Sequence, residues 1–156
     1  MRERRPEGGF ARLVPELDVR DLGVSLEFWC DALGFTVAYA RPEAAFAYLE
    51  REGAQVMLNT ANENWSTGPL APPFGRGINL QIQVVSADPI LKRLDALGWP
   101  LFRPLHEAWY RIGRDETGCR QFLVQDPDGY LLRFSEALGT RPLGPDVQIN
   151  PDVQGS

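Results

Sequence analysis

The feature that most limits how this chain can fold is a strand–turn–strand unit near its C-terminal end. The run 122–134, Phe-Leu-Val-Gln-Asp-Pro-Asp-Gly-Tyr-Leu-Leu-Arg-Phe, places two apolar segments around a turn. Pro127 fixes φ for this turn, and Gly129 can adopt the positive φ that closes it. In the second segment, residues alternate between the two faces of a strand, so Phe134 belongs to a core face and Arg133 to the opposite one.

A second unit of the same form occurs earlier in the chain. Residues 46–60 contain two β-prone segments around a turn at Gly53. Aligning Gly53 with Gly129 sets Met57 opposite Arg133. The sequence therefore predicts one module used twice.

Each unit is preceded by a strand, a helix and a further strand, so each module reads β-α-β-β-β. The predicted helices have apolar residues at helical spacing and both end in Leu-Gly-aromatic, at Leu33 and at Leu97. The predicted fold class is α+β, with two βαβββ modules that form a curved mixed sheet around a shared concavity. The predicted divisions are a flexible N-terminus 1–10, a domain 11–138 made of module one 11–60, a loop 61–77 and module two 78–138, and a C-terminal tail 139–156.

Composition excludes several classes of function. The net charge of −5 and the pI near 4.9 disfavour a nucleic-acid partner and favour a cationic ligand. No apolar run approaches the ~20 residues that span a bilayer, and residues 1–9 have no signal-peptide pattern. We therefore expect a cytoplasmic protein without a membrane partner. Cys30 and Cys119 are expected to be reduced, buried thiols.

Alternation predicts which side chains leave the core and line the concavity. These are Val14, Glu16, Asp18, Gln55, Met57, Asn59, Asn79, Gln81, Gln83, Leu131 and Arg133. Pro15 interrupts the first strand, which places that strand at a sheet edge or at a crossing between chains. In the loop, Trp65 and Phe74 have two open interpretations, as loop anchors or as ligand contacts.

The chain resembles the vicinal oxygen chelate superfamily, the glyoxalase/bleomycin resistance fold. Three motifs carry the resemblance: Val14-Pro15-Glu16-Leu17, the string from Glu27 to Phe35, and Asp126-Pro127-Asp128-Gly129. The Phe-Trp-x-Asp-x-Leu-Gly-Phe string is most similar to the bleomycin resistance branch. The resemblance implies a homodimer in which Pro15 lets the N-terminal strand cross to the partner.

In enzymes of this superfamily, His and Glu side chains hold a divalent metal in the concavity. The corresponding positions here are Val14, Met57, Asn79 and Arg133. Valine has no donor atom, methionine offers a soft thioether, and arginine carries a permanent positive charge. We therefore predict no metal, no cofactor and no catalytic residues at this location.

The resemblance instead implies a binding protein that sequesters a bleomycin-like cationic glycopeptide in grooves at the dimer interface. The family's stacking pair falls at Tyr39 and Phe46, for which packing on the sheet face is the competing interpretation. The predicted ligand-binding residues are Tyr39, Phe46, Met57, Asn59, Trp65, Trp109, Tyr110 and Arg133.

Two alternatives remain open. One is a metal-dependent lyase, isomerase or dioxygenase that uses displaced ligands, namely Glu16, Asp18, His106 or Glu136. His106 is the chain's one histidine, so a site with two histidines needs a second chain. The other alternative is a carrier of an unrelated aromatic metabolite.

Overall fold

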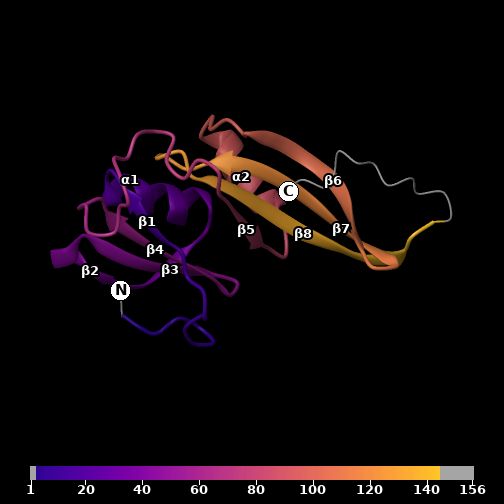
Figure 1. Ribbon diagram of the computed structural model, residues 1–156, viewed down its shortest axis with the longest axis horizontal. Coiled ribbons are helices and arrows are strands. Elements are labelled where there is room, and N and C mark those ends of the chain that lie inside the picture. The colour runs from indigo at the N-terminus through magenta and orange to yellow at the C-terminus, as the bar shows by residue number, and fades with distance from the viewer. Residues whose placement is uncertain (1–2, 145–156) are drawn as a thin grey trace.

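The computed structural model describes residues 3–144 and confirms the two modules (Figure 1). Module one has its strands in the order β1-β4-β3-β2, and module two repeats this arrangement as β5-β8-β7-β6. In each sheet the first and last strands of the module are parallel and the other pairs are antiparallel. Module one contains β1 Glu16–Val19, α1 Leu22–Glu27, a π-helical turn Phe28–Ala32, β2 Thr36–Arg41, a 3-10 turn Pro42–Ala44, β3 Phe46–Arg51 and β4 Ala54–Thr60. Module two contains β5 Asn79–Gln83, α2 Asp88–Ala96, β6 Arg103–Ile112, β7 Asp115–Gln125 and β8 Leu131–Pro142.

The two modules share one hydrophobic core. Trp29 and Leu33 from module one and Phe122 and Phe134 from module two are all fully buried within it. The rings of Phe122 and Phe134 stack with centroids 5.3 Å apart. Since this core lies on the helix-bearing sides of both sheets, the opposite sheet faces are left for other contacts.

The Asp126–Gly129 turn ties module two to module one through buried carboxylates. Asp128 is 3% exposed and accepts hydrogen bonds from the Arg20 backbone N at 3.0 Å and from the Ser25 hydroxyl at 3.3 Å. Asp126 accepts from the Trp29 indole Nε1 at 3.2 Å. Burial raises the pKa of Asp126 to about 6, although the hydrogen bonds from Trp29 and the backbone oppose this shift. The turn therefore acts as the polar joint between the modules.

Helix α1 begins after its N-cap Asp21, helix α2 begins at Asp88 with Ala87 as its N-cap, and one helix end has an added electrostatic contact. Asp21 caps α1 by accepting from the Val24 N at 3.0 Å. Arg51 Nη1 donates to the Leu33 carbonyl at 3.0 Å, and Arg93 Nε donates to the Ala32 carbonyl at 2.8 Å. Two guanidinium groups thus sit at the carbonyl end of this helical segment, where positive charge is favourable.

Some predicted boundaries differ from the structure. The strand between the second helix and the last hairpin, β6, is one long strand that begins at Arg103. It pairs with β7 as far as a tight turn at Gly113, whose φ is +61°. The strand β8 continues to Pro142 and so includes the first residues of the predicted tail. The rest of that tail, from 145, lies outside the described residues. The mixed sheet predicted from the two modules is built as two four-stranded sheets, one from each module.

The loop 61–77 is anchored by Phe74 and leaves Trp65 exposed. Phe74 is 5% exposed, packs edge-on against Tyr130 at 6.0 Å, and donates its backbone N to the Asp128 carbonyl at 2.8 Å. The anchoring interpretation therefore holds for Phe74. Trp65 is 73% exposed, and its predicted ligand contact stays a prediction.

Candidate ligand-binding site

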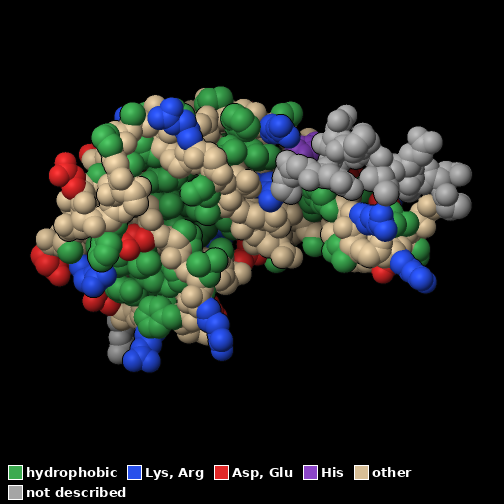
Figure 2. Space-filling model, viewed as in Figure 1, with side chains coloured by type: hydrophobic (Ala, Val, Ile, Leu, Met, Phe, Trp, Pro, Cys, Tyr) green, Lys and Arg blue, Asp and Glu red, His purple; other side chains and the backbone are tan. Residues whose placement is uncertain are grey.

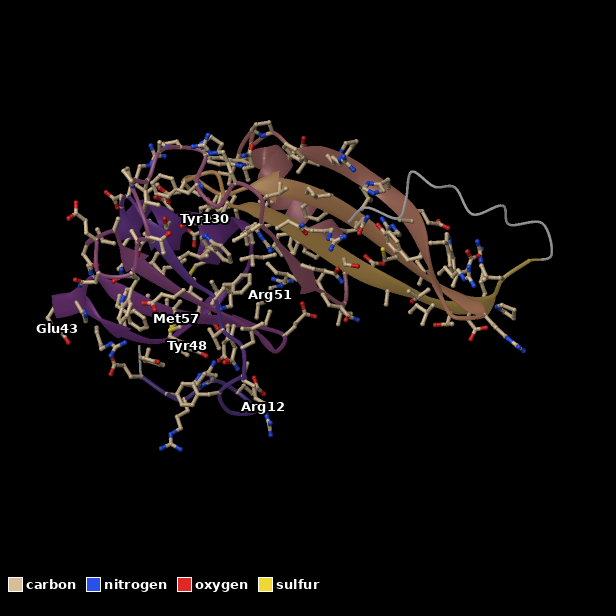
Figure 3. All side chains as sticks on the ribbon, viewed as in Figure 1. Arg12, Glu43, Tyr48, Arg51, Met57 and Tyr130 are labelled. Atoms are coloured by element: carbon tan, nitrogen blue, oxygen red, sulfur yellow. The ribbon has the colours of Figure 1, made fainter. Side chains whose placement is uncertain are left out.

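The non-core face of module one carries an aromatic cluster. Tyr39 from β2 stacks on Tyr48 from β3, with centroids 5.0 Å apart and planes 16° from parallel. The Phe46 ring lies 6.0 Å from that of Tyr39, and Met57 from β4 packs against the same cluster. Figure 3 shows Tyr48 and Met57 together on this side of the sheet, where they are cross-strand partners. The predicted stacking pair thus belongs to a larger aromatic cluster, in which Phe46 is 4% exposed and packs on the sheet face.

An N-terminal segment, residues 4–11, lies across this aromatic cluster. The Phe10 ring contacts Tyr48 edge-on at 5.6 Å and Tyr39 at 6.3 Å. Beneath it, Tyr48 is 3% exposed, whereas Phe10 itself is 55% exposed. Burial raises the pKa of the Tyr48 hydroxyl, with smaller contributions from Tyr39 and Glu50. The predicted flexibility of the N-terminus stays a prediction.

Gln55 joins the segment to the sheet through a pair of amide contacts. Its Oε1 accepts from the Ala11 backbone N at 2.9 Å, and its Nε2 donates to the Gly9 carbonyl at 2.7 Å. The Tyr48 hydroxyl also donates to the Gln55 Oε1. The side chain of Gln55 therefore pairs with the segment's peptide groups as one amide pairs with another.

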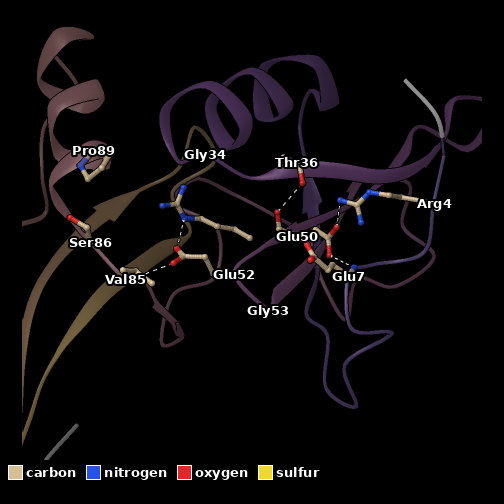
Figure 4. Close-up of a pocket in the computed structure, with 11 residues that line it drawn as sticks. Arg4, Glu7, Gly34, Thr36, Glu50, Glu52, Gly53, Val85, Ser86 and Pro89 are labelled. Atoms are coloured by element: carbon tan, nitrogen blue, oxygen red, sulfur yellow. Dashed lines mark hydrogen bonds and ion pairs between the residues drawn. The ribbon is translucent and has the colours of Figure 1, made fainter.

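Glu50 holds the other end of the segment and lines a pocket of about 630 Å³ (Figure 4). Its carboxylate, 7% exposed, forms an ion pair with Arg4 at 2.5 Å and accepts from the Glu7 backbone N at 2.7 Å. The pocket extends past Gly34 to Glu52, whose Oε1 accepts from the Val85 backbone N at 3.0 Å. It therefore has three carboxylates in its walls, those of Glu7, Glu50 and Glu52, against two guanidinium groups, those of Arg4 and Arg51.

A polar cluster lies at the β1 edge of the same face. Asn59 is the cross-strand partner of Phe46, and its amide Nδ2 donates to Asp18 at 3.0 Å. The other carboxylate oxygen of Asp18 accepts from Ser66 at 2.8 Å, which ties the loop bearing Trp65 to this face. Of the predicted residues, Tyr39, Phe46, Met57 and Asn59 are therefore brought together on one surface.

Module two presents a different face. Gln121, 5% exposed, donates to the Tyr110 hydroxyl at 2.6 Å and lies 3.1 Å from the His106 Nε2. Arg133 lies in register with Gln81 on one side and Leu123 on the other. Its Nε is buried and has no hydrogen-bond partner within residues 3–144. This face is rich in amides and carries positive charge.

Trp109 and Tyr110 point to opposite faces of β6. The Trp109 indole donates to Glu107 at 2.7 Å, and the Arg141 guanidinium lies 3.6 Å from the ring centroid. Because neighbouring residues of a strand alternate, Trp109 lies on the side away from Gln121 and Tyr110. The two predicted wall residues therefore do not share one surface within the chain.

The four positions that hold a metal in related enzymes are not gathered within one chain. Val14 and Met57 pack in the aromatic cluster of module one, Arg133 lies on the module-two face, and Asn79 lines a separate cavity of about 300 Å³ with Gln55. Among residues 3–144 no three His, Cys, Asp or Glu side chains are arranged to hold a metal ion. The metal-free prediction remains a prediction.

The displaced ligands considered above are also spread over the molecule. Asp18 is engaged by Asn59 and Ser66, and His106 lies near Gln121 in the other module. Glu136 accepts from the Ala87 backbone N at 2.9 Å, which places it beside α2. No single surface of the described chain therefore collects them.

Sequence reasoning missed three residues of the module-one face. Tyr48 follows Phe46 by two positions, so alternation along β3 could have placed it beside the stacking pair. Glu50 continues the same series. Phe10 has no such signal, because the N-terminal segment has no periodic pattern.

A match to a family model supports the fold that the strand topology indicates. The model of the glyoxalase/bleomycin resistance protein/dioxygenase superfamily matches residues 11–134. The chain belongs to this superfamily. The recognition of the vicinal oxygen chelate fold from sequence is thereby confirmed.

Named relatives of this superfamily include antibiotic resistance proteins. Bleomycin resistance proteins from Geobacillus stearothermophilus and from Staphylococcus aureus (strain MRSA252) are each 28% identical over 137 residues, covering 80% of this chain and 96% of theirs. The solved structure of TioX from Micromonospora sp. ML1 has a TM-score of 0.63 at 23% identity, covering 83% of this chain and 100% of TioX. A protein of unknown function from Agrobacterium tumefaciens str. C58 has a TM-score of 0.61 at 24% identity, covering 83% of this chain and 96% of that one. These two structures support the fold.

Within residues 3–144 the structure has no helix that is both long and apolar enough to cross a membrane.

Proposed function

We propose that this vicinal oxygen chelate protein binds and sequesters a cationic, partly aromatic antibiotic of the bleomycin type without altering it chemically. The observation that carries the proposal is the aromatic cluster of Tyr39, Phe46 and Tyr48, in which Tyr39 is partly exposed, beside the carboxylates of Asp18 and Glu50. Flat rings stack on such a surface, and a cationic group is attracted by the nearby carboxylates. The names of the curated relatives point to the same ligand class.

The experiment is calorimetric titration with metal-free and copper-loaded bleomycin. We expect saturable binding to the wild type and binding weakened about three- to tenfold in Tyr39→Ala, because one stacking contact is lost. Phe102→Ala is the matched control, since Phe102 is an exposed aromatic residue outside this face. Absence of binding to the wild type at high micromolar bleomycin would reject the antibiotic. A carrier of another aromatic metabolite would then be the remaining alternative.

The proposal includes a cytoplasmic homodimer whose ligand grooves lie between subunits. In the single chain, β1 is an edge strand paired with its own β4, and the Pro15 carbonyl accepts from the Met57 N at 2.9 Å. The same register is available to the β1 of a second copy, which is the exchange that Pro15 was predicted to permit. Light scattering after size exclusion should give the mass of a dimer at micromolar concentration. A stable folded monomer would contradict both the exchange and the interfacial groove.

Dialysis followed by elemental analysis tests the non-catalytic part of the proposal. We expect no stoichiometric metal, because the corner positions have the wrong donor chemistry for Zn, Fe, Mn or Ni. One metal equivalent per chain that survives dialysis would favour an enzyme that uses displaced ligands.

A further inference from the structure

The N-terminal segment makes the same three kinds of contact with module one that a ligand would make. It supplies an aromatic ring at Phe10, a guanidinium group at Arg4, and peptide N–H and C=O groups at residues 9 and 11. We propose that the module-one face is a binding site for a cationic aromatic amide and that residues 4–11 occupy it until a ligand displaces them. The proposal rests on the function proposed above and defines the ligand chemistry of that same site.

The cation position is the strongest part of the argument. Glu50 is 6% exposed, and both contacts that the structure describes for its carboxylate, those with Arg4 and with the Glu7 N, come from the segment. If the segment left alone, the carboxylate would lose both partners and keep only contacts with water. A ligand that displaces the segment and carries a positive charge would restore the ion pair with Glu50, in the wall of the 630 Å³ pocket (Figure 4).

The ring and amide positions follow from the remaining contacts. Phe10 lies edge-on over Tyr39 and Tyr48 and stays largely exposed, so a flat ring stacked on these tyrosines would gain more contact than Phe10 does. Gln55 presents both an acceptor and a donor to the segment, and it would do the same for an amide of the ligand. Tyr48, Glu50 and Gln55 are then the residues that set specificity.

Two features separate the segment from the fold that it covers. The family match begins at residue 11, so most of the segment lies outside the superfamily domain. Gly8 and Gly9 both have positive φ, at +79° and +89°, a conformation that glycine adopts without strain. The space-filling view shows hydrophobic side chains gathered over module one, beside which the segment runs (Figure 2). The segment can therefore move without disturbing the shared core.

The first test compares two full-length variants in bleomycin titrations. Phe10→Ala removes the ring that occupies the tyrosines, so it should bind bleomycin about five- to tenfold more tightly than the wild type. Leu13→Ala, at a neighbouring residue that is 87% exposed, is the control and should leave the affinity unchanged. Equal or weaker binding by Phe10→Ala would overturn the proposal.

The second test does not depend on the antibiotic. A synthetic peptide of residues 3–12 should bind the full-length Arg4→Ala/Phe10→Ala variant, whose site is vacated, and should not bind the wild type. The same peptide with Phe10→Ala should bind at least about tenfold more weakly, and adding Glu50→Gln to the protein should reduce binding similarly.

The two tests fail in different ways. Failure of the peptide to bind the vacated variant would overturn the inference, whatever bleomycin does. Peptide binding without bleomycin binding would reject the antibiotic and keep the site for a cationic aromatic amide.

Discussion

The two modules have the same strand order but use their free faces differently. The face of module one is aromatic and acidic, and the N-terminal segment covers it. The corresponding face of module two carries Gln81, Gln121 and Arg133, and β6 to β8 extend well beyond the length of β2 to β4 (Figure 1). A repeated backbone therefore fixes where a face lies, while the side chains decide what that face can bind.

The modules also differ at their last turns. In module one, Glu52 and Gly53 form a short, exposed turn with φ of +47° and +88°. In module two, the equivalent turn holds the buried carboxylates of Asp126 and Asp128 and binds the other module. The first turn makes one exposed contact with the other module, from the Val85 backbone N to Glu52, whereas the second joins the two halves through buried carboxylates.

The largest expected effect is the difference in stability loss between substitutions in these two turns. Asp128→Ala leaves the Ser25 hydroxyl and the Arg20 donors without their buried acceptor, so it should lower the free energy of unfolding by roughly 3 kcal/mol. Glu52→Ala removes a partly exposed ion pair with Arg51 and one backbone contact, and should cost about 1 kcal/mol. Urea denaturation measures both. Equal losses would contradict the joint assigned to module two.

A pH dependence sharpens the same comparison. The pKa of Asp126 is raised from 3.8 to about 6, so its contribution to stability is complete below pH 3.8 and falls as pH rises toward 6. Asp126→Asn does not titrate and loses one acceptor for Trp29 at every pH. Its cost in unfolding free energy should therefore be larger at pH 4.5 than at pH 7.5, by roughly 2 kcal/mol. Parallel urea titrations at the two pH values check this, and a constant cost would contradict the raised pKa.

The smallest expected effect tests the charge of the module-two face. Arg133 is a predicted ligand-binding residue, and Arg133→Gln removes its positive charge, which repels a cationic ligand; bleomycin should therefore bind about threefold more tightly at low salt. The gain should disappear at 0.3 M salt. Arg111→Gln, at an exposed residue, is the control. Weaker binding by Arg133→Gln would indicate that this guanidinium contacts the ligand favourably.

Local patterns in the sequence predicted the parts of the structure that depend on interactions between residues close together in the sequence. The Asp21 cap, the two hairpins and the alternation along β4 and β8 follow from turn chemistry and the two-residue period of strands. These patterns also predicted the two modules and the order of their elements. The family resemblance then placed Tyr39 and Phe46 in the ligand-binding site.

Contacts between distant segments could not be predicted in this way. The contact between Phe10 and Tyr48 could not be predicted from residues 4–11. This segment has no hydrophobic periodicity, and its partners are distant in the sequence. The opposite directions of Trp109 and Tyr110 follow from alternation, but only once β6 is known to continue past both residues. The burial of Asp126 and Asp128 depends on a helix from the other module.

Because Asp126 and Asp128 join the two modules, neither half of the chain is complete without the other. Trp29, Ser25 and Arg20 of one half donate hydrogen bonds to the buried carboxylates of Asp126 and Asp128 in the other half. Two halves produced separately, by cleavage within 61–77, would each expose part of the hydrophobic core and hydrogen-bond donors or acceptors without their partners. When they are mixed, the two halves should associate into one folded protein.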